Sequence, residues 1–271
     1  MALGYGRQQA VRVAPQPRRH GRVERTGRTW STRHAPILPV RLQVAWTPSG
    51  GKAESMHTDQ DAPGTLAQRE RLALADLFDT VGPDAPTLCA GWRTRDLAAH
   101  LVTREGHPSA VGVVLPLAAG WTERTRSGLA AGDYTALVDR FRHGPPVVSP
   151  LRLPGADKRF NTFEHFVHHE DVLRGGEQWR ARELSPTDQQ ELWDRVRGTA
   201  RWYLRQAPVP VQLLAPGFGG VRVGDGDDGV TIKGTPGEIV LYLNGRGEHA
   251  RVDISGSDEA VDRWSRHHLG V

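Results

Sequence analysis

The sequence has almost no cysteine and no long apolar segment, and each shortage excludes a class of protein. Cys89 is the only cysteine among 271 residues, so an internal disulfide framework is impossible and a reducing compartment is expected. The longest apolar stretch, 110–121, contains Pro116 and is shorter than the roughly 18–20 residues that a membrane helix needs. Hydrophobic residues still make up 38% of the chain. We therefore expect a soluble, cytoplasmic protein with a packed core.

Positive charge is unevenly distributed, which weakens the argument for nucleic-acid binding that a net charge of +4 suggests. Residues 1–55 hold ten of the 35 Lys and Arg residues and two of the 31 acids, so the rest of the chain has a net charge of −4. We predict that residues 1–60 form a disordered basic leader. We favour Met56 as the native start; the alternative is a tail that contacts nucleic acid or anionic lipid by charge alone.

The middle of the chain has helical periodicity, and its end is rich in short β segments. Helices are predicted at 66–81, 94–105, 133–142, 160–174 and 186–206. After Pro208, short β-rich segments alternate with turn residues, and a terminal helix is predicted at 257–270. The predicted class is therefore mainly α followed by α+β, with a helical domain over 61–207 and a small domain over 208–271.

Two segments of the C-terminal part need a choice between structures. Gly224–Gly229 contains three aspartates but lacks the spacing and terminal Glu of a calcium-binding EF-hand loop, so we interpret it as a hairpin turn. The segment 235–245 is apolar enough for a buried strand. It also fits a helix capped by Thr235 with Glu238 closing a capping box, and both alternatives stay open.

The segment 161–174, NTFEHFVHHEDVLR, concentrates histidines and acids on a predicted helix. On a helical wheel Glu164, His168 and Asp171 fall within about 60° of one another beside the apolar face, whereas His165 and His169 fall on the far side. We therefore expect His165 and His169 to face solvent. Glu164 and His168 have the i,i+4 spacing that brings two ligands to one metal ion. The alternative is a hydrogen-bonded pair at the edge of a packing surface.

A third ligand has to come from another segment, and His100 is the natural candidate. It lies beside the apolar stripe of its predicted helix, where a lone histidine is more often a satisfied core residue. Two helices that each present imidazole or carboxylate groups inward are, however, the usual basis of metal sites in helical bundles. Cys89 could be a nucleophile, but its apolar surroundings favour a small buried hydrophobic residue.

These residues resemble a known family. GWRTRDLAAHL around His100, followed some sixty residues later by the pattern E-x-x-x-H-x-x-D, is similar to the mycothiol-dependent maleylpyruvate isomerases within the DinB-like metal-binding proteins. The segments RHGPP and GEIVLYLNGR extend the similarity to an actinobacterial branch known only as metal-binding. The resemblance covers residues 66–271. It implies a DinB-like four-helix bundle and a small, sterol-carrier-like C-terminal domain.

The resemblance also implies that His100, Glu164 and His168 bind a divalent metal, zinc, and that Asp171 orients His168. The resulting hypothesis is a zinc-dependent enzyme that uses a low-molecular-weight thiol, mycothiol, for isomerisation or S-transfer; the alternative is a non-catalytic metal- or ligand-binding protein. Arg95, Arg104 or Arg174 could hold a substrate carboxylate, the alternative for each being a surface cation. The expected partner is a small molecule or thiol, without a membrane, and the oligomeric state is left open.

Overall fold

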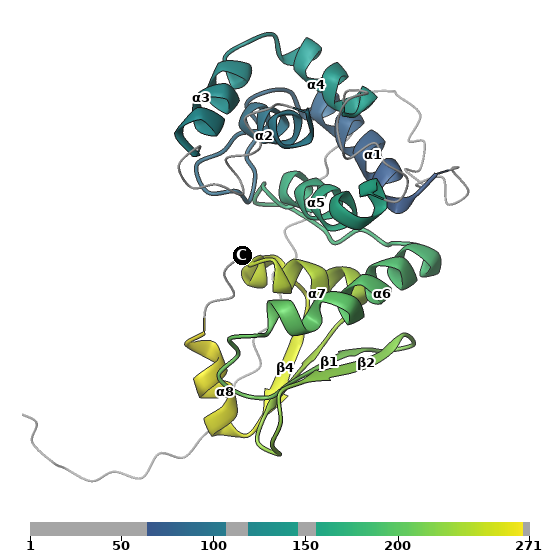
Figure 1. Ribbon diagram of the computed structural model, residues 1–271, viewed down its shortest axis with the longest axis vertical. Coiled ribbons are helices and arrows are strands. Elements are labelled where there is room, and N and C mark those ends of the chain that lie inside the picture. The colour runs from purple at the N-terminus through teal and green to yellow at the C-terminus, as the bar shows by residue number, and fades with distance from the viewer. Residues whose placement is uncertain (1–63, 107–118, 146–155, 268–271) are drawn as a thin grey trace, which may run out of the picture. The chain divides into compact units, whose positions relative to one another are not determined.

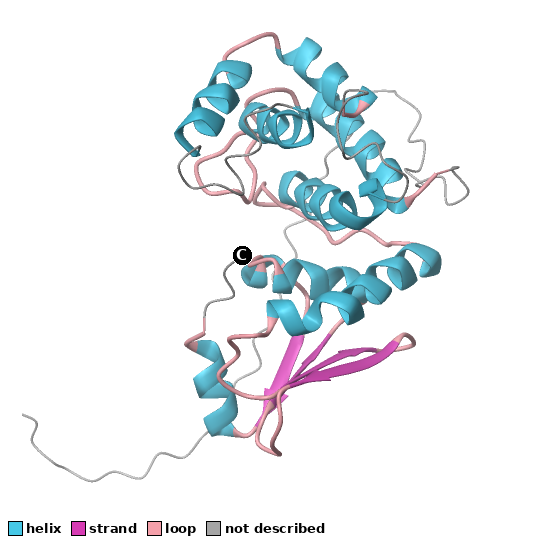
Figure 2. Cartoon of the chain, viewed as in Figure 1, coloured by secondary structure: helices cyan, strands magenta, loops and turns pink. Residues whose placement is uncertain are grey.

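The computed structural model describes residues 64–106, 119–145 and 156–267. The chain divides into two units, Met1–Ser55 and Met56–Val271, and all described residues belong to the second. Predictions for the basic leader lie outside the described residues. The elements run in the order shown in Figure 1, with the helices in cyan and the strands in magenta in Figure 2. Among the described helices, none is both long and apolar enough to span a membrane.

The first half of the described chain is helical, as predicted except at Ala119–Ala130, where no helix was predicted. The helices are α1 (Leu66–Val81), α2 (Thr94–Gly106), α3 (Ala119–Ala130), α4 (Tyr134–His143) and α5 (Ala156–Leu173). Thr65 and Gln68 form a capping box at the start of α1, and Asp133 caps α4. One hydrophobic cluster joins α1, α2 and α4 through fully buried side chains such as Phe78, Leu97 and Phe141. This cluster fixes the helix that carries His100.

The sixth helix packs with the C-terminal part of the chain. Ser185 caps α6 (Pro186–Tyr203), with Pro186 as its first residue, as predicted. The buried side chains of α6, Trp193 among them, share one hydrophobic cluster with the sheet and with α7 (Pro236–Leu243). The described residues thus form a helical part and a smaller α+β part, which confirms the predicted class. The four-helix bundle and the boundary at residue 207 remain predictions.

A four-stranded sheet forms the C-terminal part. Its strands are β1 (Val211–Ala215), β2 (Gly219–Val223), β3 (Val230–Lys233) and β4 (Asp253–Gly256), in the order β2-β1-β3-β4. β1 pairs antiparallel with β2 and parallel with β3. The predicted hairpin at 224–229 is therefore wrong. Residues 224–229 do reverse the direction of the chain between β2 and β3. These two strands do not pair with each other, however, because β1 lies between them.

The segment for which strand and helix stayed open is the helix α7. Thr235 occupies the N-cap position but makes no side-chain capping bond. Glu238 instead accepts hydrogen bonds from Arg174, which directly follows α5, and from the backbone N–H of Arg251. Almost every residue of α7 is buried, and periodicity does not distinguish a helix buried on all sides from a buried strand. Helix α8 (Asp258–Ser265), capped by Ser257, lies within the predicted terminal helix.

Candidate metal centre

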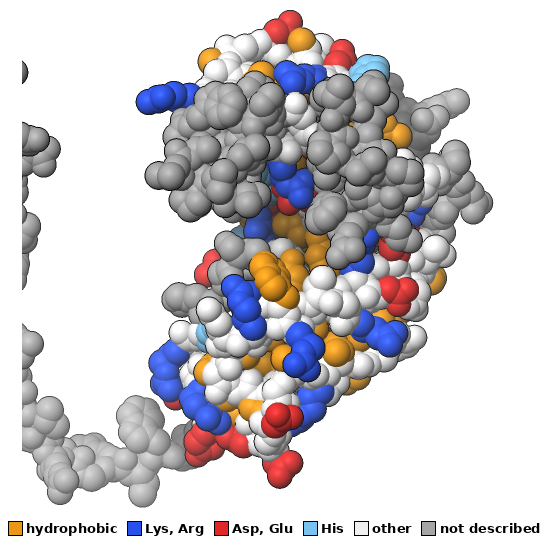
Figure 3. Space-filling model, viewed as in Figure 1, with side chains coloured by type: hydrophobic (Ala, Val, Ile, Leu, Met, Phe, Trp, Pro, Cys, Tyr) orange, Lys and Arg blue, Asp and Glu red, His pale blue; other side chains and the backbone are white. Residues whose placement is uncertain are grey.

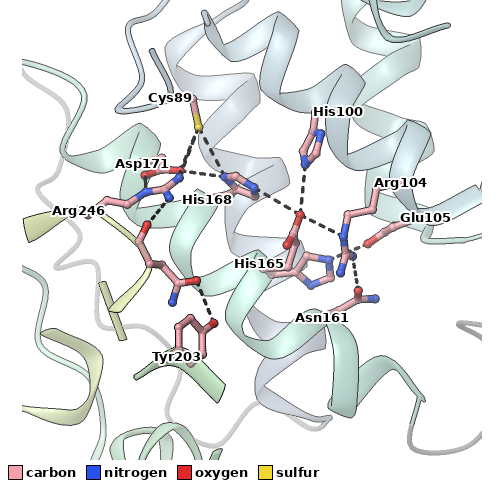
Figure 4. Close-up of polar contacts among 12 residues, drawn as sticks. Cys89, His100, Arg104, Glu105, Asn161, His165, His168, Asp171, Tyr203 and Arg246 are labelled. Atoms are coloured by element: carbon pink, nitrogen blue, oxygen red, sulfur yellow. Dashed lines mark hydrogen bonds and ion pairs between the residues drawn. The ribbon is translucent and has the colours of Figure 1, made fainter. Parts of the chain in front are cut away.

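Helices α2 and α5 bring the three predicted ligands together (Figure 4). The Nε2 atoms of His100 and His168 lie 3.2 and 3.4 Å from the same oxygen, Oε1 of Glu164. The potential ligand atoms of the three residues all lie within 4.8 Å of one another. We call His100, Glu164 and His168 the metal group. Two imidazoles and one carboxylate are a donor set that suits zinc and leaves one position of a tetrahedral site open.

The side chains of the metal group lie at different depths. His168 is nearly buried, with 11% of its side chain exposed, whereas His100 and Glu164 are 28% and 23% exposed. The ring of Trp92 packs against His100 with 5.1 Å between centroids, and the guanidinium carbon of Arg126 lies 4.9 Å from the Trp92 ring. These contacts hold His100 on the more exposed side of the group.

The charges of the metal group depend on one another. Burial opposes ionisation of Glu164, but hydrogen bonds with His100 and His168 and the charge of Arg104 outweigh it and hold the pKa of Glu164 well below its usual value. Burial likewise lowers the pKa of His168, whereas its hydrogen bonds with Asp171, Cys89 and Glu164 raise that pKa well above the usual value. The site therefore concentrates negative charge around the His168 imidazole, as a cation site requires.

Asp171 lies on the opposite side of His168 from Glu164. Its Oδ2 is 2.8 Å from His168 Nδ1, the contact expected of a carboxylate that orients a metal-binding histidine. Arg246 donates to both oxygens of Asp171, at 2.9 and 2.6 Å, and the thiol of Cys89 lies 3.2 Å from Oδ2. Burial raises the pKa of Asp171, but His168 and Arg246 outweigh burial and lower the pKa to about 2. Asp171 is therefore ionised at neutral pH.

The sequence does not predict the contacts of two residues beside Asp171, Cys89 and Arg246. Cys89 packs partly against the helical core, but it is half-buried and its sulfur also lies 3.8 Å from His168 Nδ1. The prediction of a simple buried hydrophobic residue is therefore wrong. No feature of the sequence predicts a role for Arg246. Both residues are far from His168 in the sequence, and no local pattern marks a contact between such distant segments.

Cys89, His168 and Asp171 form a second group of possible metal ligands, with atoms also within 4.8 Å of one another. The guanidinium of Arg246 lies directly against this group, 2.6 Å from Asp171 and 3.7 Å from the Cys89 sulfur. Arg246 thus occupies both oxygens of Asp171. Because Arg104 lies 3.2 Å from Glu164 Oε1, a cation borders the metal group as well, and charge alone does not separate the two groups.

Three arginines, Arg95, Arg104 and Arg174, were predicted as candidates for holding a substrate carboxylate. Of these three, only Arg104 lies beside the metal group. Its Nε is 3.2 Å from Glu164 Oε1, and its Nη1 donates to Asn161 at 2.7 Å. Arg95 pairs with Asp84 at 3.0 Å. Arg174 is buried between Glu170 and Glu238, at 2.6 and 2.8 Å, so it is neither a surface cation nor a free anion-binding group.

The prediction that His165 and His169 face solvent is wrong, because both are buried. His165 contacts the carbonyl oxygen of Ala67 at 2.8 Å and Glu105 at 2.7 Å. His169 contacts Glu70 at 2.7 Å. These carboxylates belong to α1 and α2, so the polar face of α5 packs on other polar side chains instead of on water. A helical wheel of α5 alone contains no sign of these partners.

Comparison with known proteins supports the fold. No family model matches the chain, and no curated protein matches it. Two solved structures are similar to it, each covering 70% of this chain and 90% of the other at 18% identity: a mycothiol-dependent maleylpyruvate isomerase with one histidine replaced by alanine (TM-score 0.50), and the mycothiol-dependent maleylpyruvate isomerase (TM-score 0.49). At this identity the likeness concerns fold alone. The chain is thus similar in fold to a mycothiol-dependent maleylpyruvate isomerase.

Proposed function

We propose that this protein binds a divalent metal ion, zinc, through His100, Glu164 and His168. The observation that carries the proposal is the convergence of both imidazole Nε2 atoms on one oxygen of Glu164. His100 reaches this oxygen from another helix, 64 residues earlier in the sequence. The donor set is the His₂Glu set of catalytic zinc sites. Asp171 supports it, because metal-binding histidines almost always donate their other ring N–H to a carboxylate or carbonyl.

We further propose that the metal serves an enzyme reaction with a low-molecular-weight thiol, mycothiol, either isomerisation or S-transfer. A zinc ion with an open position supplies a positive charge that lowers the pKa of a thiol and so favours the reactive thiolate. The proposal is supported by the fold likeness to a protein described as a mycothiol-dependent maleylpyruvate isomerase. Partial exposure of His100 and Glu164 leaves access for a small molecule.

The chain's own residues have separate parts in this proposal. His100 and His168 hold the ion through Nε2, and Asp171 fixes the ring of His168 through Nδ1. Arg104, beside Glu164, is the cation best placed to hold the carboxylate of an acidic substrate. Asn161 accepts a hydrogen bond from Arg104 and fixes the direction of its guanidinium.

The test is metal analysis of purified wild-type protein and of the variants Glu164→Ala and His168→Ala. Both variants should lose zinc. The matched control, His143→Ala, removes an exposed histidine that contacts its own helix and should leave the zinc content unchanged. Full zinc retention by both site variants would refute the metal site.

A second measurement separates an enzyme from a binding protein. The zinc-loaded protein is mixed with mycothiol and either a cis-unsaturated acid or an alkylating electrophile. Isomerisation returns the thiol unchanged and is followed as conversion of the acid to its trans isomer, whereas S-transfer is followed as loss of free thiol. Either reaction, if it depends on Glu164 and His168, supports the thiol-dependent enzyme; tight zinc binding with neither reaction would instead support the non-catalytic metal-binding protein. On the described part of the face in Figure 3, basic side chains lie beside acidic and apolar ones. We do not propose a nucleic-acid partner.

A further inference from the structure

The carboxylate of Asp171 is a point where three segments of the chain meet. Its side chain has no exposed surface, and Oδ2 receives His168 Nδ1 at 2.8 Å, Arg246 Nη2 at 2.6 Å and the Cys89 thiol at 3.2 Å. Arg246 Nε also donates to Oδ1 at 2.9 Å. A bidentate guanidinium of this kind fixes both the position and the plane of a carboxylate.

Arg246 is itself held by the turn that ends α7. Its backbone N–H donates to the carbonyl of Leu241 at 3.0 Å, and its Nη1 donates to the carbonyl of Asn244 at 2.5 Å. Gly245, which precedes it, has φ of 79°, a left-handed conformation that side chains rarely adopt. The side-chain oxygen of Asn244 accepts from Tyr203 at 3.1 Å, which ties the turn to the end of α6. The guanidinium is therefore presented by an ordered turn.

The position of Asp171 decides which nitrogen of His168 can act as a ligand. When a histidine ring donates from Nδ1 to a carboxylate, Nε2 is the nitrogen that would exchange its proton for a metal ion, and His168 Nε2 is the atom that faces Glu164. Any group that holds Asp171 in place therefore also holds the ligand atom in place. Arg246 makes the two shortest of the contacts that Asp171 receives from outside α5.

From this geometry we propose that Arg246 is a positioning residue of the metal centre, which acts through Asp171 on His168 and so raises the affinity for the metal. The α+β part of the chain thereby contributes to a site whose three ligands all come from the helical part. The inference rests on the proposed metal site, but it makes a separate claim about an arginine that contacts no ligand in the structure.

The test measures the zinc dissociation constant of the full chain by competition with a chromophoric chelator. Arg246→Gln should weaken zinc binding by about 10-fold, the lower end of the cost of losing the partner of a metal-binding histidine, because Asp171 itself remains. Arg246→Lys should lie between wild type and Arg246→Gln, because an ammonium makes one contact where the guanidinium makes two. Arg251→Gln, which removes an exposed arginine near the same turn, is the control and should bind as wild type.

A double-mutant cycle shows whether Arg246 acts through Asp171. In the Asp171→Asn background, Arg246→Gln should have no further effect on the zinc dissociation constant, since its route to His168 is already cut. Additive losses would overturn the inference, and so would unchanged affinity in Arg246→Gln. The melting temperature of the zinc-free variants separates positioning from a folding defect, and Arg246→Lys serves if Arg246→Gln does not fold.

The outcomes for the two proposals are distinct. Zinc binding that is lost in His168→Ala but unchanged in Arg246→Gln would refute only the role of Arg246. Zinc binding that survives both Glu164→Ala and His168→Ala would refute the metal site itself.

Discussion

Replacing Glu70 by glutamine tests whether burial against polar partners stabilises the polar face of α5. Oε2 of Glu70 accepts from His169 at 2.7 Å and from Arg182 at 2.8 Å, and the residue is 4% exposed. Burial raises the pKa of Glu70, but the charges and hydrogen bonds of Arg182 and His169 outweigh it and lower the pKa from 4.5 to about 2. The native protein therefore favours the ionised carboxylate.

The magnitude follows from the two pKa values. A pKa that folding lowers from 4.5 to about 2 corresponds to about 3 kcal/mol of stability at pH 7. Because the folded pKa is the lower one, this contribution is complete above the unfolded pKa of 4.5 and is lost as the pH falls toward 2. Glu70→Gln should therefore reduce the free energy of unfolding by about 3 kcal/mol at pH 7 and by roughly half of that at pH 3.

The assay is urea unfolding followed by tryptophan fluorescence, from pH 7 to the lowest pH at which both proteins fold. Glu123→Gln is the matched control. The pKa of Glu123 is also lowered to about 2, by its hydrogen bond with Arg126, but the side chain is 60% exposed. Water screens that pair, so its loss should change stability little. Equal small losses in the two variants, or a Glu70→Gln loss that does not change with pH, would refute the reasoning.

Two further substitutions probe how the parts pack. Gly175→Ala should destabilise the fold by about 1–3 kcal/mol in thermal unfolding, because an added Cβ would lie 2.7 Å from the Cα of Thr87. Gly176→Ala is the control and should show no such loss, because a Cβ at that position would have no neighbouring atom within 4 Å. Arg174→Gln removes the ion pair of buried Glu238 and one of the two ion pairs of buried Glu170, and should cost about 3–5 kcal/mol in urea unfolding. The exposed control Arg266→Gln should cost little, and equal effects would contradict this account.

The sequence is informative about the metal group because the relevant geometry is local. Glu164, His168 and Asp171 lie three or four residues apart on one helix, so the helical repeat alone places them on one flank. His100 is different. Its helix and its place beside the apolar stripe could be predicted, but its position opposite Glu164 depends on how α2 packs, and the resemblance to a known pattern added support for it.

The sequence misleads where polar side chains are buried with polar partners. The wheel places His165 and His169 away from the apolar face, and a polar face is normally a wet one. Here Glu70 and Glu105 approach from other helices and replace the water. Partners that lie 60 and 99 residues away leave no trace in a helical period, and so this error has a physical cause.

The C-terminal sheet shows the same limit for strands. Turn residues at 224–229 correctly separate two strands, yet they do not reveal that β1 lies between those strands. Strand pairing depends on which apolar faces meet in the core, and here β1 pairs with both β2 and β3. The places of Cys89 and Arg246 beside Asp171 are likewise products of tertiary packing.

The buried polar groups in α5 and directly after it have a consequence for how the chain folds. His165 pairs with Glu105 of α2, His169 pairs with Glu70 of α1, and Arg174 pairs with Glu238 of α7. A half-assembled chain leaves some of these groups desolvated without a partner, which is costly. Partly folded intermediates are therefore destabilised by several unpaired groups at once. We expect the described parts to unfold in a single cooperative transition. A complete metal group then exists only in molecules that have finished folding.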